Sequence, residues 1–141
     1  MSTSIIQQIA DALLVRITGV AGMGNTGLAQ RLSIDTFPAC FLDRVEGEAE
    51  PGTMGGPGRK VCSTDFVWLI HARDVDAFPQ MADIRKAVND AIEVAPYDMG
   101  VAGVMRPFCK SFRLFNPATD KDRGIAELTV NVKHTEGYGA A

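Results

Sequence analysis

The sequence lacks the features on which several large functional classes depend. Its 141 residues carry a net charge of −3, so there is no basic excess to hold nucleic acid by counterion release. No apolar run approaches the roughly 18 residues of a membrane-spanning helix, and the first residues show no signal peptide. With 46% apolar and 22% charged residues, the chain is expected to fold as one ordinary domain.

Cysteine and histidine are also scarce. The three cysteines, Cys40, Cys62 and Cys109, are widely spaced and form no C-x-x-C pair, and the only histidines are His71 and His134. A zinc site needs three or four ligands at recognisable spacing, which these positions do not offer. We therefore predict no metal and no cofactor, and we interpret the cysteines as small hydrophobic residues in a reducing compartment.

The first predicted element is an amphipathic helix. Ser4 is a favourable N-cap, and Gln7 stands three residues later, as in a capping box. Gly19 and Gly22 mark its end, and a glycine-rich loop follows up to Gly27. The apolar residues recur at helical spacing: Ile5, Ile6, Ile9, Leu13 and Ile17.

Two strands and a glycine-rich hairpin tip are predicted next. Residues 37–45 read as one strand, and residues 61–73, apolar on both faces, read as the central strand of the sheet. Between them, residues 51–58 contain four glycines and two prolines, which cannot bury enough surface to offset their ordering entropy. We expect residues 46–60 to form a long mobile loop.

The second half predicts a helix and two closing strands. Pro79 suits the first turn of the helix, whose apolar stripe packs on the sheet. That stripe comprises Met81, Ile84, Val88, Ala91 and Ile92. Residues 108–115 alternate as a strand, residues 116–124 read as an exposed loop, and residues 137–141 as a disordered tail. In the last strand, the residues expected to face the core are Ala126, Leu128, Val130 and Val132. The predicted fold is α+β, with an antiparallel sheet of about four strands packed by two helices.

One motif points to a nucleotide. Gly22, Gly24 and Gly27 give the spacing G-x-G-x-x-G, and Asp43 stands where an acid would meet a ribose hydroxyl. The context opposes it, because a helix after Gly27 would have only about ten residues, fewer than a parallel crossover needs. Residues 5–17 also read as a helix rather than the preceding strand. We favour a loop in which glycines supply unusual backbone angles, and keep a small nucleotide-binding enzyme as the alternative from another class.

Other candidates for chemistry have structural interpretations that we favour. Asp120, Asp122 and Glu127 are interrupted by bases and read as a solvated loop, and His71 has no evident nucleophile to activate. Cys62 lies near Lys60, which could activate a thiol, but an inert thiol is favoured. No catalytic residue is predicted. The alternating acids Glu46, Glu48 and Glu50 read as a solvated face or as a site for a partner's bases.

The order of these elements resembles one known family. Three stretches carry the resemblance: Asp35-Thr36-Phe37-Pro38-Ala39-Cys40-Phe41-Leu42, the strand from Asp65 to Ala72, and Ile125-Ala126-Glu127-Leu128-Thr129-Val130-Asn131-Val132. Over roughly residues 4–134 the chain resembles the tail terminator (minor tail) proteins of long-tailed bacteriophages. The resemblance implies a structural, non-enzymatic protein that forms a ring, usually hexameric, at the head-proximal end of the tail tube. There it stops tube polymerisation and offers a face for head attachment.

The resemblance also implies partners and a location. The partners would be further copies of the chain, the tail tube protein and the head-neck connector, with DNA crossing the lumen without specific binding. The location would be the tail of the virion, after assembly in the host cytoplasm. Another neck or tail-tube component is the alternative within the same class. We expect the segment 46–60 to order against the neighbouring subunit, and the charged residues of this predicted interface are Glu46, Glu48, Glu50, Arg59 and Lys60.

Overall fold

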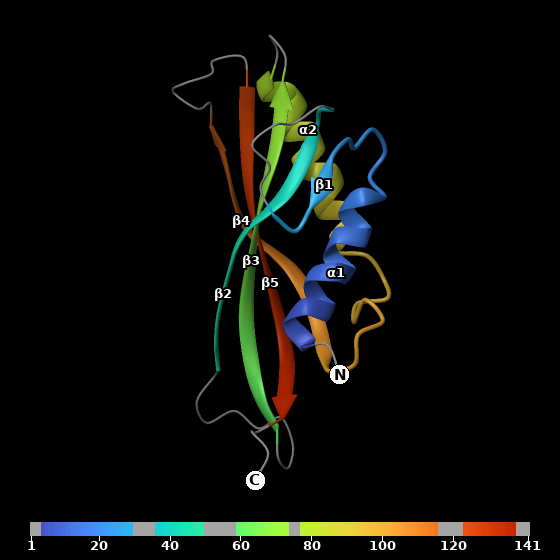
Figure 1. Ribbon diagram of the computed structural model, residues 1–141, viewed down its shortest axis with the longest axis vertical. Helices are drawn as coiled ribbons and strands as arrows, with labels where there is room; N and C mark the ends of the chain where they lie inside the picture. Colours follow the sequence, from blue (N-terminus) through green and yellow to red (C-terminus); the bar gives the residue numbers. More distant parts are fainter. Residues whose placement is uncertain (1–3, 30–35, 50–58, 74–76, 116–122, 138–141) are drawn as a thin grey trace.

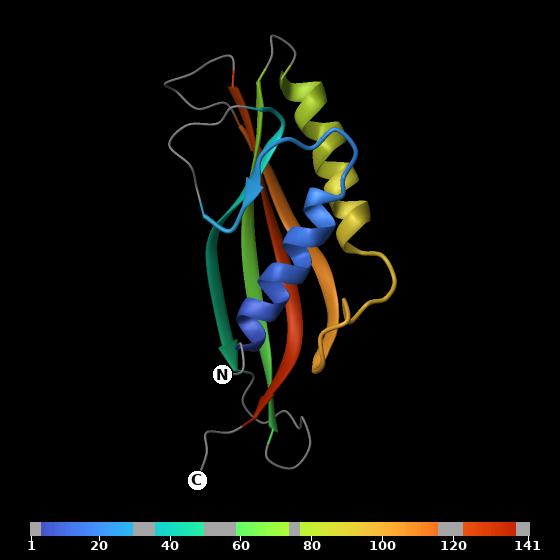
Figure 2. The same cartoon turned by 45° about the vertical axis from the view of Figure 1, so that its right-hand side comes forward.

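The structure, a computed structural model, describes residues 4–29, 36–49, 59–73, 77–115 and 123–137. Within these ranges the elements are α1 (Ile5–Thr18), β1 (Thr26–Gly27), β2 (Ala39–Ala49), β3 (Arg59–Arg73), α2 (Ala77–Ile92), β4 (Val104–Phe115) and β5 (Arg123–Gly137). The strands form one sheet in the order β1-β2-β3-β5-β4, and both helices cover the same face of it (Figures 1 and 2). The predicted α+β fold is confirmed. The short β1 is an addition that pairs parallel with β2 and makes the sheet mixed.

Helix α1 begins and ends as its sequence predicts. The Ser4 hydroxyl accepts a hydrogen bond of 3.2 Å from the backbone N–H of Gln7, which is the expected N-cap contact. At the other end, the N–H of Gly19 donates to the carbonyl of Val15 at 3.1 Å. The residues at helical spacing that become buried are Ile9, Ala10, Leu13 and Ile17. This stripe attaches α1 to the sheet.

Strand β3 is central, as predicted, and carries much of the core. It lies between β2 and β5 and pairs antiparallel with both. Trp68 is fully buried and sits opposite Leu128 in the β3–β5 register. Val88 of α2 and Val130 belong to the same buried cluster, and Ile84 packs at its margin. The predicted meeting of the last strand with the second helix is therefore confirmed.

The predicted loop 46–60 is shorter than expected. Residues 46–49 continue β2 and residues 59–60 begin β3, so both ends of the segment are paired strand. The backbone groups there that face the neighbouring strand find partners on it, and this pairing outweighs the weak strand preference of glycine and glutamate. Residues 50–58, the remainder of the predicted loop, lie outside the described residues.

The two closing strands are also longer than predicted. Strand β4 begins at Val104 rather than at 108, and β5 starts at Arg123 within the predicted loop. Gly137, assigned to the tail, ends β5 in register with Arg59. The 15 residues of β3 offer pairing partners to both ends of β5, and β5 in turn offers partners to the start of β4. The loop residues 116–122 and the tail residues 138–141 lie outside the described part of the chain.

Strand β4 departs from simple alternation. Its register against β5 shifts between Cys109 and Ser111, which is the signature of a bulge. Phe112 therefore lies opposite Leu128, and the Arg85 guanidinium of α2 sits 4.0 Å from its ring centroid. Phe108, on the other side of the bulge, lies opposite Asn131 and is exposed. The bulge thus sends two aromatic side chains of one strand to different faces of the sheet.

Candidate assembly surface

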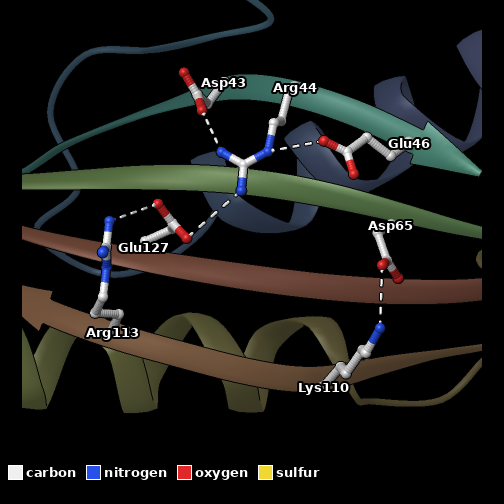
Figure 3. Close-up of polar contacts among 7 residues, drawn as sticks. All are labelled: Asp43, Arg44, Glu46, Asp65, Lys110, Arg113 and Glu127. Atoms are coloured by element: carbon white, nitrogen blue, oxygen red, sulfur yellow. Dashed lines mark hydrogen bonds and ion pairs between the residues drawn. The ribbon is translucent and has the colours of Figure 1, made fainter.

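The sheet face opposite the helices carries charged side chains that cross the strands (Figure 3). Arg44 of β2 contacts three carboxylates, those of Asp43 at 2.9 Å, Glu46 at 3.1 Å and Glu127 at 3.7 Å. Glu127 of β5 also contacts Arg113 of β4 at 3.4 Å. These contacts connect β2, β5 and β4 across this face, which we call the open face.

A second polar cluster on the open face joins the strands closer to the end of the sheet where β2 ends and β3 begins. Lys110 Nζ of β4 lies 3.2 Å from the Asp65 carboxylate of β3 and so reaches across β5 (Figure 3). Asn131 of β5 donates to the same carboxylate at 2.8 Å and to the Ser63 hydroxyl at 2.7 Å. Exposed ion pairs of this kind add little stability. Their alternating charges instead suit a hydrated surface or a contact with another polar surface.

The predicted interface residues occupy two faces rather than one. Glu46 and Glu48 lie on the open face, in register with Asp65 and Ser63. Lys60 instead contributes to a pocket on the helix side, beside Ile6 of α1. Strand alternation thus separates Lys60 from the two acids, and the role of these residues in a subunit interface stays a prediction. Glu46, moreover, already pairs with Arg44 in its own chain. Glu50 and the Arg59 side chain lie outside the described residues.

Sequence reasoning missed most of the charged residues on this face. Arg44 and Glu127 lie on strands far apart in the sequence, and only the sheet register brings them together. The sequence predicts a solvated acidic loop for Glu127 together with Asp120 and Asp122. The structure instead places Glu127 in β5, and the other two lie outside the described residues. A usable signal was the alternation of β5, which already assigned Glu127 to the face away from the core.

An exposed apolar pocket adjoins the open face at strand β4. Met105 and Phe108 are 51% and 58% exposed, unusual for such large apolar side chains. With Arg106, Asn131 and Lys133 they line a surface pocket of about 390 Å³. Arg106 also stacks on Tyr97, with 4.8 Å between its guanidinium carbon and the ring centroid. The pocket combines apolar surface with positive charge.

The glycine-rich loop serves packing rather than phosphate binding. It follows a helix, α1, and leads into the short edge strand β1, which reverses the strand–loop–helix order of a dinucleotide site. Gly22 has φ +83°, a conformation that favours glycine. A Cβ on Gly24 would lie 2.8 Å from the backbone oxygen of Thr36, so a side chain does not fit there. The prediction that glycine supplies an unusual backbone angle in this loop is confirmed at Gly22, whereas Gly24 is required by the close approach of Thr36.

Two of the thiols and the imidazole of His71 favour their neutral forms. Burial raises the pKa of the Cys40 thiol far above its usual range. Burial, aided by Glu93, raises the pKa of Cys109 to about 12. Burial and the nearby Arg123 lower the pKa of His71, so its imidazole is neutral near pH 7, and it packs 6.2 Å from the Phe41 ring. These groups act as core residues.

The described part of the chain lacks two features that would point to other functions. No group of three or more His, Cys, Asp or Glu residues there could hold a metal ion. None of the helices in those ranges has the length and apolar character needed to cross a membrane.

Comparisons with known proteins add one informative similarity. Neither a protein-family model nor a curated protein sequence matches the chain. A chain of the solved structure "Virion of native gene transfer agent (GTA) particle" does match, with a TM-score of 0.62 and 18% sequence identity. The match covers 94% of this chain and 92% of the other. At this identity the similarity establishes a shared fold from end to end.

Proposed function

We propose that this protein is a virion structural subunit that assembles into a ring at the head-proximal end of a tail tube. The ring ends tube polymerisation and presents a face for head attachment. The observation that carries the proposal is the fold shared with a chain of a gene transfer agent virion over 94% of this chain and 92% of the other. The proposed partners are further copies of this chain, the tail tube protein and a head-neck connector.

The surface chemistry of the subunit supports this role. A ring needs two different, complementary surfaces on each copy, so that contacts repeat head to tail and close. The sheet offers two sides, β2 and β4, that lie at opposite ends of the strand order, apart from the two-residue β1. A net charge of −3 suits a channel that DNA crosses without being held, since electrostatic retention requires a basic surface.

Electron microscopy of the concentrated protein, combined with a mass measurement in solution, tests the proposal. We expect closed rings of uniform stoichiometry, most simply hexamers, and no growth beyond one ring. Adding these rings to polymerising tail tube subunits of the same particle should cap the tubes. Open tubes of the protein itself would instead indicate a tail-tube component, and a monomer at every concentration would contradict ring assembly.

A nucleotide titration separates this role from the enzyme alternative. Because the loop from Gly22 to Gly27 lacks the strand–loop–helix order of a dinucleotide site, we expect no saturable binding of NAD or ATP. A binding isotherm that is lost in a Gly24→Ala variant of unchanged fold would favour the enzyme.

A further inference from the structure

The two sides of the sheet carry opposite charge. Strand β4 contains three bases, Arg106, Lys110 and Arg113, and no acid. Strand β2 contains three acids, Asp43, Glu46 and Glu48, against the single base Arg44. The two strands occupy opposite sides of the lower half of the molecule (Figure 2). One copy therefore presents an acidic side where the next copy can present a basic one.

The strand register places the key charges at the same level. Glu48 of β2 pairs with Ser63, Ser63 pairs with Lys133, and Lys133 pairs with Arg106 of β4. One row across four strands thus ends in an acid on one side and a base on the other. The row next to it runs from Glu46 to Phe108 in the same way. In a cyclic ring the copies are related by rotation about the ring axis, which leaves the height of each residue along that axis unchanged. If the strands run along the axis, residues of one row on β2 of one copy therefore meet residues of the same row on β4 of the next.

Backbone pairing is an unsuitable way to join these sides. Between Leu42 and Ala49, β2 has no paired strand on its outer side among the described residues, so its edge is open. On β4, however, Pro107 has no N–H, and the N–H of Cys109 donates to the Glu93 carboxylate at 2.8 Å. These features oppose edge-to-edge strand pairing along residues 107–109 of β4. A contact at this part of β4 would therefore rely on side chains.

The pocket at β4 provides the means for a side-chain contact. Met105 and Phe108 supply apolar surface whose burial contributes affinity, and Arg106 supplies the charge that selects an acidic partner. Glu48 is exposed on β2. We propose that the acidic outer half of β2 in one copy docks on the β4 pocket of the next copy, with Glu48 facing Arg106. This inference rests on the proposed ring and names the surfaces that close it.

Charge reversal tests this contact. Glu48→Lys and Arg106→Glu should each raise the protein concentration needed for half-maximal ring formation by about tenfold or more, because like charges then face each other at every interface. The double variant Glu48→Lys/Arg106→Glu should form rings again. An equimolar mixture of the two single variants should form rings in which the variants alternate. At one interface the reversed β2 side of the Glu48→Lys variant meets the reversed β4 side of the Arg106→Glu variant. At the next interface two unchanged sides meet, so opposite charges face each other at both.

Matched controls separate this contact from a general effect of charge. Asp11→Lys on α1 and Lys86→Glu on α2 change exposed residues of the helix layer and should leave ring formation unchanged. Phe108→Ser should weaken rings without any change of charge. Melting curves confirm that each variant folds.

Two results overturn the contact. If either single variant forms rings at the same concentration as the wild type, the contact lies elsewhere. The same conclusion follows if the double variant forms no rings. Both results leave the proposed ring intact. A wild-type protein that forms no ring at any concentration would overturn the proposed function itself.

Discussion

Arg16 of α1 binds the last carbonyl of α2 and two carbonyls of the segment that follows it, with 2.6 Å between its Nη1 and the oxygen of Ile92. The same nitrogen lies 2.7 Å from the oxygen of Val94, and Nη2 lies 2.6 Å from that of Pro96. A helix leaves its final carbonyls without partners, and its C-terminus favours positive charge. One side chain thus closes α2 and fixes α1 beside it.

Replacing this arginine should therefore lower stability. Arg16→Met keeps the apolar stem but removes three hydrogen bonds, and we expect it to cost about 1.5–3 kcal/mol of the free energy of unfolding. Lys86→Met is the matched control, because it removes only an exposed pair with Asp90 on α2. Urea unfolding monitored by circular dichroism measures both. Equal effects of the two substitutions would contradict the role assigned to Arg16.

Truncating the core side of β5 should be costly. Leu128 is fully buried and lies opposite Trp68, so Leu128→Ala should destabilise the fold by about 2–5 kcal/mol. Its neighbour Thr129 points to the other face, and Thr129→Ala should cost far less. Thermal melting compares the two. A neutral Leu128→Ala variant would mean that the core closes around the cavity without loss.

A methyl group on Gly24 should disturb the loop, not a binding site. Its Cβ would lie 2.8 Å and 2.9 Å from backbone atoms of Thr36, which cannot move aside as a side-chain tip can. We expect Gly24→Ala to cost about 1–3 kcal/mol, as overpacking does. Gly19→Ala is the control, because φ there is −77° and the nearest atoms are 3.6 Å away. An unchanged melting temperature for Gly24→Ala would show that the loop can shift.

Acid should weaken the fold through its buried histidines. His134 is fully buried with Nε2 2.8 Å from the Thr64 hydroxyl, and burial lowers its pKa although Glu136 opposes the shift. Burial lowers the pKa of His71 as well. The fold therefore favours neutral imidazoles, so their contribution is complete above the unfolded value of 6.5 and is lost as pH falls below it.

The expected slope can be measured directly. Between the unfolded pKa and the lowered folded pKa, each histidine should reduce the free energy of unfolding by about 1.4 kcal/mol per pH unit. Urea unfolding between pH 7.5 and pH 5 should show this loss, and His134→Gln should flatten it. A stability that rises on acidification in this range would contradict neutral burial.

The segment between β2 and β3 should matter for assembly rather than for folding. Removing residues 50–58 and joining β2 to β3 through a short turn leaves both strands and the core intact. We expect an unchanged melting temperature and a loss of rings, because the glycine- and proline-rich segment is predicted to order against the neighbouring subunit. Rings that form as readily as in the wild type would show that this segment takes no part in assembly.

The sequence alone determined the elements whose signals are local. The cap formed by Ser4 and Gln7, the helical stripe of α1, and the alternation of Leu128 and Val130 in β5 depend on neighbouring residues and on the period of the element. Each was predicted correctly for that reason. The sequence also indicated that the G-x-G-x-x-G spacing around Gly24 is not a nucleotide site, because that judgement depends only on the order of helices and strands along the chain.

Only the tertiary structure decided which distant residues meet. Arg44 reaches Glu127 across β3, and Arg16 reaches the end of α2, because strand register and helix packing bring together segments about 80 residues apart. Strand pairing also extended β2 into the predicted loop, since β3 offered partners for its backbone. The level shared by Glu48 and Arg106 arises in the same way, because a row across four strands is a property of the assembled sheet and of no single segment.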